Sequence, residues 1–106
     1  LGGEPCEVRL YASTGEVKEP ERRVEEAEAR YEEGFRTIKI RVHDFDEAVD
    51  IRHVEETAKA VGGRMKIAVD VNQGWRVTII GDAPVWNLER AKRFSDACAR
   101  AGVAWI

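Results

Sequence analysis

The chain has 106 residues, 43% of them hydrophobic and 35% charged, a balance that supports a buried core and excludes compositional disorder. Seventeen Lys and Arg against twenty Asp and Glu leave a net charge of -3, so the basic excess that favours nucleic acid or an anionic membrane surface is missing. The sequence also lacks an apolar run of about 18 residues, which would predict a membrane span. Because Cys6 and Cys98 follow neither metal-site nor disulfide-scaffold spacing, we expect reduced thiols in a cytoplasmic protein.

Four segments rich in apolar and β-branched residues predict strands, read from the N-terminus. They are residues 8–13, 37–42, 66–72 and 103–106. The first three begin at even intervals, and the interval has the length of a strand followed by a helix. Such units are joined by crossover connections that make neighbouring strands parallel. The sequence therefore predicts an α/β protein with a parallel sheet.

Three amphipathic helices are predicted between these strands, each with a start signal and a glycine stop. The start signals are Pro20, then Asp44 or Asp46, then Asn87, and the stops are Gly34, Gly62 and Gly102. Apolar residues recur at helical spacing inside each segment. The expected apolar faces are Val24, Ala27 and Tyr31; Ile51, Val54, Ala58 and Val61; and Leu88, Ala91, Phe94, Cys98 and Ala101. His53 stands among charged residues of the second helix, so we expect it on the surface.

The strand patterns distinguish between two parallel architectures, a doubly wound open sheet and a (β/α)8 TIM barrel. Strands of an open sheet are covered on both faces and read as continuous apolar runs. Here apolar residues alternate with Thr37, Lys39 and Arg41 in the second strand, and with Asp70 and Asn72 in the third. One face then meets the helices and the other lines a shared polar interior, as in a barrel. Residues 1–106 would form the N-terminal portion of that barrel, with its first three βα units and the start of a fourth strand.

Polar side chains on the inward face form the candidate site. Lys39 and Arg41 lie two residues apart and point to the same side of their strand. Asp70 and Asn72 on the next strand supply oxygen atoms that suit a hard cation such as Mg²⁺, although one carboxylate does not make a metal site. The same residues also fit an internal ion pair between Asp70 and Lys39 or Arg41 in a barrel without catalysis.

Two further residues share the inward position and are candidates for substrate binding. Ser13 ends the first strand, and His43 follows the second strand at the mouth of the predicted barrel. The loop from Gln73 to Trp86 is longer than most strand-to-helix connections. We expect this loop to form a wall of the site or to pack against another domain.

Four segments together match a known family in order and spacing: residues 10–13 (LYAS), 34–41 (GFRTIKIR), 69–75 (VDVNQGW) and 102–106 (GVAWI). They resemble the enolase superfamily, in its mandelate racemase and muconate lactonizing branch. The resemblance implies a two-domain enzyme with a capping domain before the barrel, and neither that domain nor the remaining barrel lies in this chain. It also implies a Mg²⁺ ion that stabilises the enediolate formed when a base removes the proton α to a substrate carboxylate.

The resemblance assigns roles to particular residues. Asp70 matches the first of three carboxylate metal ligands, with the other two expected beyond Ile106, and Asn72 matches a contact to substrate or metal-bound water. Lys39 and Arg41 match a catalytic Lys-x-Lys pair, but Arg41 departs from it because a guanidinium stays protonated and is a poor base. The base is then expected on the opposite face, which favours elimination over racemisation.

We therefore expect an acid-sugar dehydratase acting on a small carboxylate substrate, as part of a homo-oligomer. Racemisation, epimerisation or cycloisomerisation on the same scaffold is the first alternative. A Schiff-base aldolase using Lys39 is disfavoured by the neighbouring Asp70. The remaining alternative is a non-catalytic barrel with an internal charge cluster formed by Lys39, Arg41 and Asp70.

Overall fold

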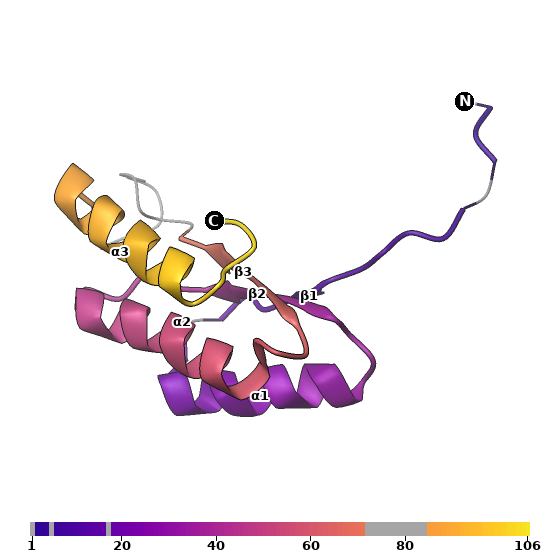
Figure 1. The fold of residues 1–106 in the computed structure, drawn as a ribbon, viewed down its shortest axis with the longest axis horizontal. Helices are drawn as coiled ribbons and strands as arrows, with labels where there is room; N and C mark the ends of the chain where they lie inside the picture. The colour runs from indigo at the N-terminus through magenta and orange to yellow at the C-terminus, as the bar shows by residue number, and fades with distance from the viewer. Residues whose placement is uncertain (1, 5, 17, 72–84) are drawn as a thin grey trace.

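Strands and helices alternate along the chain (Figure 1). The computed structural model describes residues 2–4, 6–16, 18–71 and 85–106. The elements are β1 (Ala12–Ser13), α1 (Pro20–Glu32), β2 (Thr37–Arg41), α2 (Glu47–Val61), β3 (Lys66–Asp70) and α3 (Leu88–Arg100). This order confirms the predicted succession of strand and helix units as far as the third helix.

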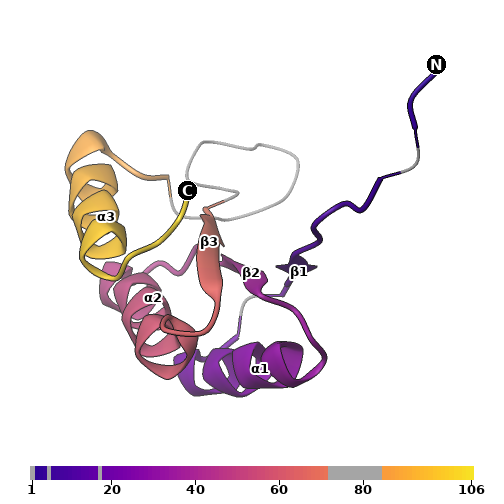
Figure 2. The same cartoon turned by 45° about the vertical axis from the view of Figure 1, so that its right-hand side comes forward.

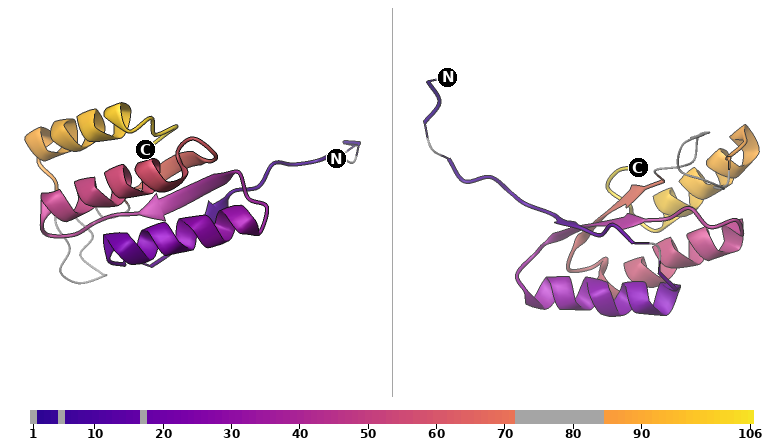
Figure 3. Two further views of the ribbon diagram at one scale, coloured as in Figure 1. Left: turned by 60° about the horizontal axis from the view of Figure 1, so that its bottom comes forward. Right: turned by 180° about the vertical axis from the view of Figure 1, so that it is seen from behind.

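The three strands form one parallel sheet in the order β1-β2-β3. β2 and β3 pair along their whole length, from Thr37 opposite Lys66 to Arg41 opposite Asp70, so that their carboxyl ends meet at one edge. The three helices lie over the same face of the sheet (Figure 2). Two of them, α1 and α2, pack side by side along it (Figure 3). The opposite face of the sheet carries no helix of the described part.

Burial along β2 confirms the predicted alternation. Ile38, Ile40 and Val42 are each 0% exposed because they point into the helix layer. The intervening residues are all partly exposed, and they are Thr37, Lys39 and Arg41. The apolar side chains thus fix which face of the strand is covered, and this places the two cations on the other face.

The first strand is shorter than predicted. Only Ala12 and Ser13 pair with β2, opposite Ile38 and Lys39, whereas the prediction began at residue 8. This register carries residues 8–10 past the amino end of β2, where no partner strand of the described part meets them. Val8 and Leu10 are accordingly 74% and 73% exposed. Alternating sequence alone does not make a strand without a neighbouring backbone to pair with.

The end of the sheet also differs from the prediction. β3 stops at Asp70, and the predicted fourth strand at 103–106 is a single parallel bridge between Ala68 and Trp105. Ala68 is 0% exposed although its position falls on the inward face, and the parallel bridge places the segment around Trp105 beside it at the edge of the sheet. The ring of Trp105 also packs edge-on against Tyr11, with 6.1 Å between ring centroids. The end of the chain thus lies beside β3 and also contacts the segment that precedes β1.

Helix ends follow the predicted signals. Pro20 occupies the first turn of α1, and the side chains of Asp46 and Asn87 accept hydrogen bonds from Ala48 N and Arg90 N at the starts of α2 and α3. Asp46 rather than Asp44 is thus the cap of α2. Gly34 and Gly102 follow α1 and α3 with φ of 99° and 72°, the left-handed conformation that glycine adopts without strain. Among the helices of the described part, none is long and apolar enough to cross a bilayer.

The core lies between the sheet and the helices. Its buried apolar residues include Ala27, Ile38, Ile40, Val54, Val69, Phe94 and Cys98. Cys98 is a free thiol on the inner face of α3, and burial raises its pKa to about 11, so it behaves as a small apolar side chain. The prediction that Cys98 packs in the core is confirmed. Leu88, by contrast, is 68% exposed at the start of α3, although helical spacing placed it on the apolar face.

The buried face of α2 is more polar than predicted. Along with Val54 and Val61 it contains Asp50, His53 and Thr57, all 0% exposed. The expectation that His53 lies on the surface is therefore wrong. Residues 50, 53, 54, 57 and 61 follow helical spacing and make one stripe, which the packing of α1 and the sheet covers.

His53 predicts a pH-dependent stability. Burial first, and the positive charge of Arg23 second, lower the pKa of the imidazole from its ordinary value of 6.5. At higher pH the ring is neutral in both folded and unfolded protein. As pH falls below 6.5, the unfolded chain takes up a proton that the folded chain still excludes. The free energy of unfolding should fall by up to about 1.4 kcal/mol per pH unit until the lower folded pKa is reached.

Thermal unfolding measured between about pH 8 and pH 5 checks this expectation. His53→Gln should remove most of the slope because the titrating group is gone. His43→Gln is the matched control, because it removes a histidine outside the buried stripe of α2, and it should retain the slope. An unchanged slope in His53→Gln would contradict the assignment.

Candidate active site

An ion pair stands at the carboxyl ends of β2 and β3. Lys39 Nζ donates a hydrogen bond to Asp70 Oδ2 at 2.9 Å, and the two side chains are only 14% and 24% exposed. Lys39 lies opposite Ala68 in the register, so its long side chain reaches diagonally to Asp70. Lys39 and Asp70 lie, as predicted, on the face of the sheet that no described helix covers. The contact is partly shielded from water, which makes it stronger than an exposed pair.

Arg41 makes a different contact. It lies directly opposite Asp70 in the register, yet its Nη1 donates to the carbonyl oxygen of Gly15 at 2.7 Å. The guanidinium therefore holds the loop that follows β1, while the amine of Lys39 pairs with the carboxylate. Because a guanidinium stays protonated in proteins, Arg41 adds a fixed positive charge beside the ion pair.

The loop after β1 is held to β2 and α1 by several further bonds. Thr14, 4% exposed, donates from both N and Oγ1 to the carbonyl oxygen of Lys39, at 3.1 and 2.8 Å. Arg23, 0% exposed, donates to the carbonyl oxygen of Glu16 and to the carboxylate of Glu26. The loop thereby fixes the carbonyl that binds Arg41.

The remaining predicted site residues take separate positions. Ser13 is exposed and lies opposite Lys39 in the register, so it belongs to the same edge of the sheet. His43 is half-buried in the β2–α2 loop (residues 42–46), two residues beyond Arg41. Asn72 lies outside the described residues, as does most of the loop expected to form a wall. The structure thus brings Lys39, Arg41, Asp70 and Ser13 to one edge.

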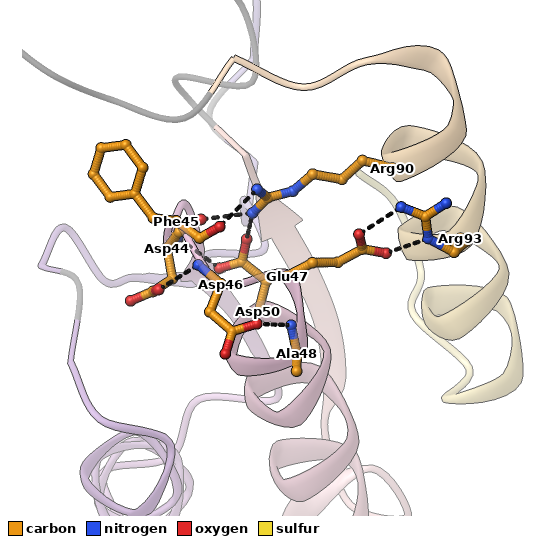
Figure 4. A network of polar contacts seen from close by, with 8 residues as sticks. All are labelled: Asp44, Phe45, Asp46, Glu47, Ala48, Asp50, Arg90 and Arg93. Atoms are coloured by element: carbon orange, nitrogen blue, oxygen red, sulfur yellow. Dashed lines mark hydrogen bonds and ion pairs between the residues drawn. The ribbon is translucent and has the colours of Figure 1, made fainter.

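The β2–α2 loop is bound by two residues that the sequence analysis missed, Asp50 and Arg90 (Figure 4). Asp50 Oδ1 accepts from Asp44 N at 2.9 Å, and Asp50 Oδ2 accepts from Arg90 Nη2 at 2.7 Å. Arg90 also donates to the carbonyl oxygens of Asp44 and Phe45, at 2.6 and 3.2 Å. The Asp50 carboxylate thus accepts a hydrogen bond from an N–H group of the loop, and the Arg90 guanidinium donates hydrogen bonds to two of its carbonyl oxygens.

The burial of Asp50 has an electrostatic consequence. Burial raises the pKa of its carboxyl, while the hydrogen bonds from Asp44 N and Arg90 act in the opposite direction. A signal for Asp50 existed in the sequence, because residue 50 precedes Val54 and Val61 on one helical stripe. No local pattern pointed to the role of Arg90, because its guanidinium hydrogen-bonds to Asp44, Phe45 and Asp50, which lie 40 or more positions earlier in the chain.

The donor set at this edge fits one ligand of a hard divalent cation. Asp70 supplies a carboxylate at the end of β3, whereas Lys39 and Arg41 are cations and bind no metal. Among the residues that the structure describes, no group of three or more His, Cys, Asp or Glu side chains is placed to hold a metal ion. Asp70 could therefore contribute one ligand to a Mg²⁺ site, with the further ligands coming from beyond the described residues.

Fold and site together define an α/β unit of parallel strands with its charged groups at their carboxyl ends. The chain belongs to the enolase C-terminal domain-like family, whose model matches residues 22–106. This finding confirms the resemblance noted in the sequence.

Curated relatives share the same segment. The chain is 43% identical over 63 residues to an L-Ala-D/L-Glu epimerase of Bacillus subtilis, a match that covers 59% of this chain and 17% of the relative. It is 43% identical over 75 residues to an L-Ala-D/L-Glu epimerase of Thermotoga maritima, covering 71% and 21%. An N-succinyl-L-Arg/Lys racemase of Bacillus cereus is 33% identical over 60 residues, covering 57% and 16%. The chain thus spans about a fifth of these relatives or less.

Solved structures show the same fold. A dipeptide epimerase from Methylococcus capsulatus, complexed with Mg ion, matches with a TM-score of 0.72 at 20% identity, over 91% of this chain and 24% of that one. The N-succinyl Arg/Lys racemase of Bacillus cereus matches with a TM-score of 0.74 at 23% identity, over 92% and 23%. The chain therefore shares the fold of about a quarter of each of these proteins.

Proposed function

We propose that residues 1–106 are the N-terminal portion of the catalytic (β/α)8 barrel of a longer enzyme, which moves a proton at the carbon α to a substrate carboxylate. The Lys39–Asp70 pair at the carboxyl ends of β2 and β3 carries this proposal, because barrel enzymes place their chemistry at that end of the strands. The family assignment and the short span of the match support it.

Among such reactions we favour racemisation or epimerisation. The curated relatives named above are epimerases or racemases, and none of them is a dehydratase. The acid-sugar dehydratase expected from Arg41 thus has no support from the comparisons. That expectation rested on the weak basicity of arginine. Weak basicity limits what Arg41 itself can do, but it does not determine which reaction the whole enzyme catalyses.

The substrate class follows from what the relatives' names have in common. An Ala-Glu dipeptide and an N-succinyl amino acid each carry a carboxylate beside a carbon whose nitrogen is acylated. We propose an N-acylated α-amino acid, either a dipeptide or an N-acyl derivative, as the substrate of this enzyme. A negatively charged substrate of this type suits an edge that carries Lys39 and Arg41.

Each charged residue then has a separate task. Asp70 would hold Mg²⁺, which supplies Lewis-acid stabilisation of the charge that develops on the substrate carboxylate. Lys39 orients the Asp70 carboxylate through its 2.9 Å hydrogen bond. Arg41 places a permanent positive charge at the same edge and keeps the loop after β1 in position through Gly15. We expect the proton-accepting groups in the portion of the barrel outside this chain.

Proton exchange in deuterated buffer tests the proposal. The complete enzyme, with Mg²⁺, should incorporate deuterium at the α-carbon of an L,L-dipeptide or N-succinyl amino acid and form the other epimer. Chiral chromatography and NMR separate this outcome from elimination, which would release water from a sugar acid and leave a keto product. Dehydration of a sugar acid without dipeptide exchange would overturn the racemase assignment. Absence of exchange from both substrate classes would favour the non-catalytic barrel.

A further inference from the structure

The contacts of Arg90 with the β2–α2 loop differ from an ordinary helix-to-helix ion pair. Its guanidinium donates to the backbone at Asp44 and Phe45 and to the carboxylate of Asp50, and Asp50 in turn binds Asp44 N. Arg90 is 12% exposed at its side chain and Asp50 is 0% exposed. The bonds that Asp50 makes with Asp44 and Arg90, and the bond from Arg90 to the carbonyl oxygen of Asp44, are partly buried, so their loss would leave buried polar groups unpaired.

A second ion pair joins the same two helices and provides an internal comparison. Arg93 of α3 binds Glu47 of α2 through two hydrogen bonds of 2.7 Å (Figure 4). The side chains of Arg93 and Glu47 are 56% and 23% exposed, and in the described part of the chain neither forms a side-chain hydrogen bond to the backbone of the β2–α2 loop. This pair can couple the helices, but only the pair formed by Asp50 and Arg90 acts on the loop itself.

The loop held in this way begins at the candidate active site. Val42 N donates to the carbonyl oxygen of Asp70 at 3.2 Å, and the next residue is His43. Arg41 is the last residue of β2 before the loop. The bond from Val42 holds the end of β2 to β3, so a shift of the loop backbone at Asp44 would move the neighbouring His43 relative to Asp70.

Arg90 is itself held in place on two sides. Asn87 Oδ1 accepts from Arg90 N at 2.8 Å, which fixes the first turn of α3. The guanidinium lies 4.9 Å from the ring centroid of Trp86, a cation–π contact. The arginine is thus pre-organised to bind the loop, and the start of α3 is coupled to the β2–α2 loop through one side chain.

We propose that Asp50 and Arg90 are positioning residues, which fix the β2–α2 loop so that its segment with His43 is pre-arranged at the substrate-facing edge. The proposal rests on the proposed function, because it assigns that loop to the rim of the same site. Neither residue touches the substrate. They act by holding the backbone atoms of the β2–α2 loop in place. An enzyme site needs such atoms to be positioned within a fraction of an ångström.

Two variants of the complete enzyme remove the clamp formed by Asp50 and Arg90. Arg90→Met keeps an apolar stem over Trp86 but makes none of the loop bonds. Asp50→Asn keeps the shape but has one oxygen acceptor for two donors. We expect kcat/KM for α-proton exchange to fall about tenfold in each, mainly through KM, and amide exchange of residues 43–46 to accelerate about tenfold or more.

Arg93→Met is the matched control, because it breaks an ion pair between the same helices without touching the loop. It should leave kcat/KM and the amide exchange of residues 43–46 unchanged. Arg90→Lys, which retains the charge but not the planar fork, should lie between wild type and Arg90→Met. If thermal unfolding shows that Arg90→Met does not fold, Arg90→Lys is the variant that tests the positioning role.

The outcomes separate this inference from the proposed function. If the wild-type enzyme exchanges the α-proton and the Asp50 and Arg90 variants behave like Arg93→Met, the positioning role is overturned. If the variants release the loop in amide exchange while kcat/KM stays constant, the clamp exists but does not serve the site, and the inference also fails. If the wild type is inactive towards all substrates, the proposed function fails, whatever the amide exchange of the variants shows.

Discussion

Asp70→Asn in the complete enzyme is expected to abolish nearly all α-proton exchange. The substitution keeps the shape of the side chain but replaces a charged oxygen ligand by a neutral one. We expect Mg²⁺ affinity to fall about a hundredfold and the exchange rate about a thousandfold, because a metal supplies several kcal/mol and about 1.4 kcal/mol corresponds to a factor of ten. Titration calorimetry with Mg²⁺ and exchange in deuterated buffer measure the two effects separately.

Two controls isolate the ligand role of Asp70. Asp96→Asn makes the same chemical change at an exposed position of α3 and should alter neither quantity. Lys39→Met removes one ion-pair partner of Asp70 but leaves the carboxylate. If Lys39→Met weakens Mg²⁺ binding as much as Asp70→Asn does, the loss arises from the broken pair and not from a missing ligand. Unchanged Mg²⁺ affinity in folded Asp70→Asn would reject the metal assignment outright.

Arg41→Met is expected to slow exchange by about ten- to a hundredfold, the effect of losing a charged hydrogen bond worth roughly 1.5–3 kcal/mol. The variant loses both the fixed positive charge at the site and the 2.7 Å bond to Gly15. Since the guanidinium does not release its proton, the pH dependence of the reaction should keep the same basic-group pKa as the wild type. The measurement is kcat/KM for α-proton exchange as a function of pH.

Arg41→Lys distinguishes charge from geometry at this position. A lysine restores the positive charge but lacks the planar fork and the reach of the arginine. Partial recovery relative to Arg41→Met supports an electrostatic role. If Arg41→Met instead loses the basic ionisation from the pH profile while it still binds substrate and Mg²⁺, then Arg41 is the base and the role proposed here is wrong.

Alternation in the sequence was sufficient to predict the sheet and the location of its charged edge. In β2 every second residue is buried, and Lys39 therefore had to lie on the uncovered face together with Arg41. The same period placed Asp70 of the adjoining strand on that face. These assignments depend only on the geometry of a strand and on which side chains avoid water, so they can be made from a single sequence.

The alternation did not show where each strand stops pairing with its neighbour. Residues 8–11 alternate as well as β2 does, yet only Ala12 and Ser13 form a strand, since the register with β2 leaves the earlier residues unpaired. The segment 103–106 likewise forms one bridge to Ala68. A strand needs a partner backbone, and the presence of a partner at a given residue is a property of the whole arrangement.

The sequence by itself determined the order of the elements, the helix starts at Pro20 and Asn87, and the face of the sheet on which Lys39 and Asp70 lie, whereas the structure decided between Asp44 and Asp46 as the cap of α2. Tertiary structure decided which cation pairs with which acceptor. Arg41 binds a backbone carbonyl 26 positions away, and Arg90 binds the β2–α2 loop across 45 and 46 positions. The physical reason is that spacing along a strand or helix sets only the direction of a side chain, whereas its partner depends on packing between elements distant in the chain.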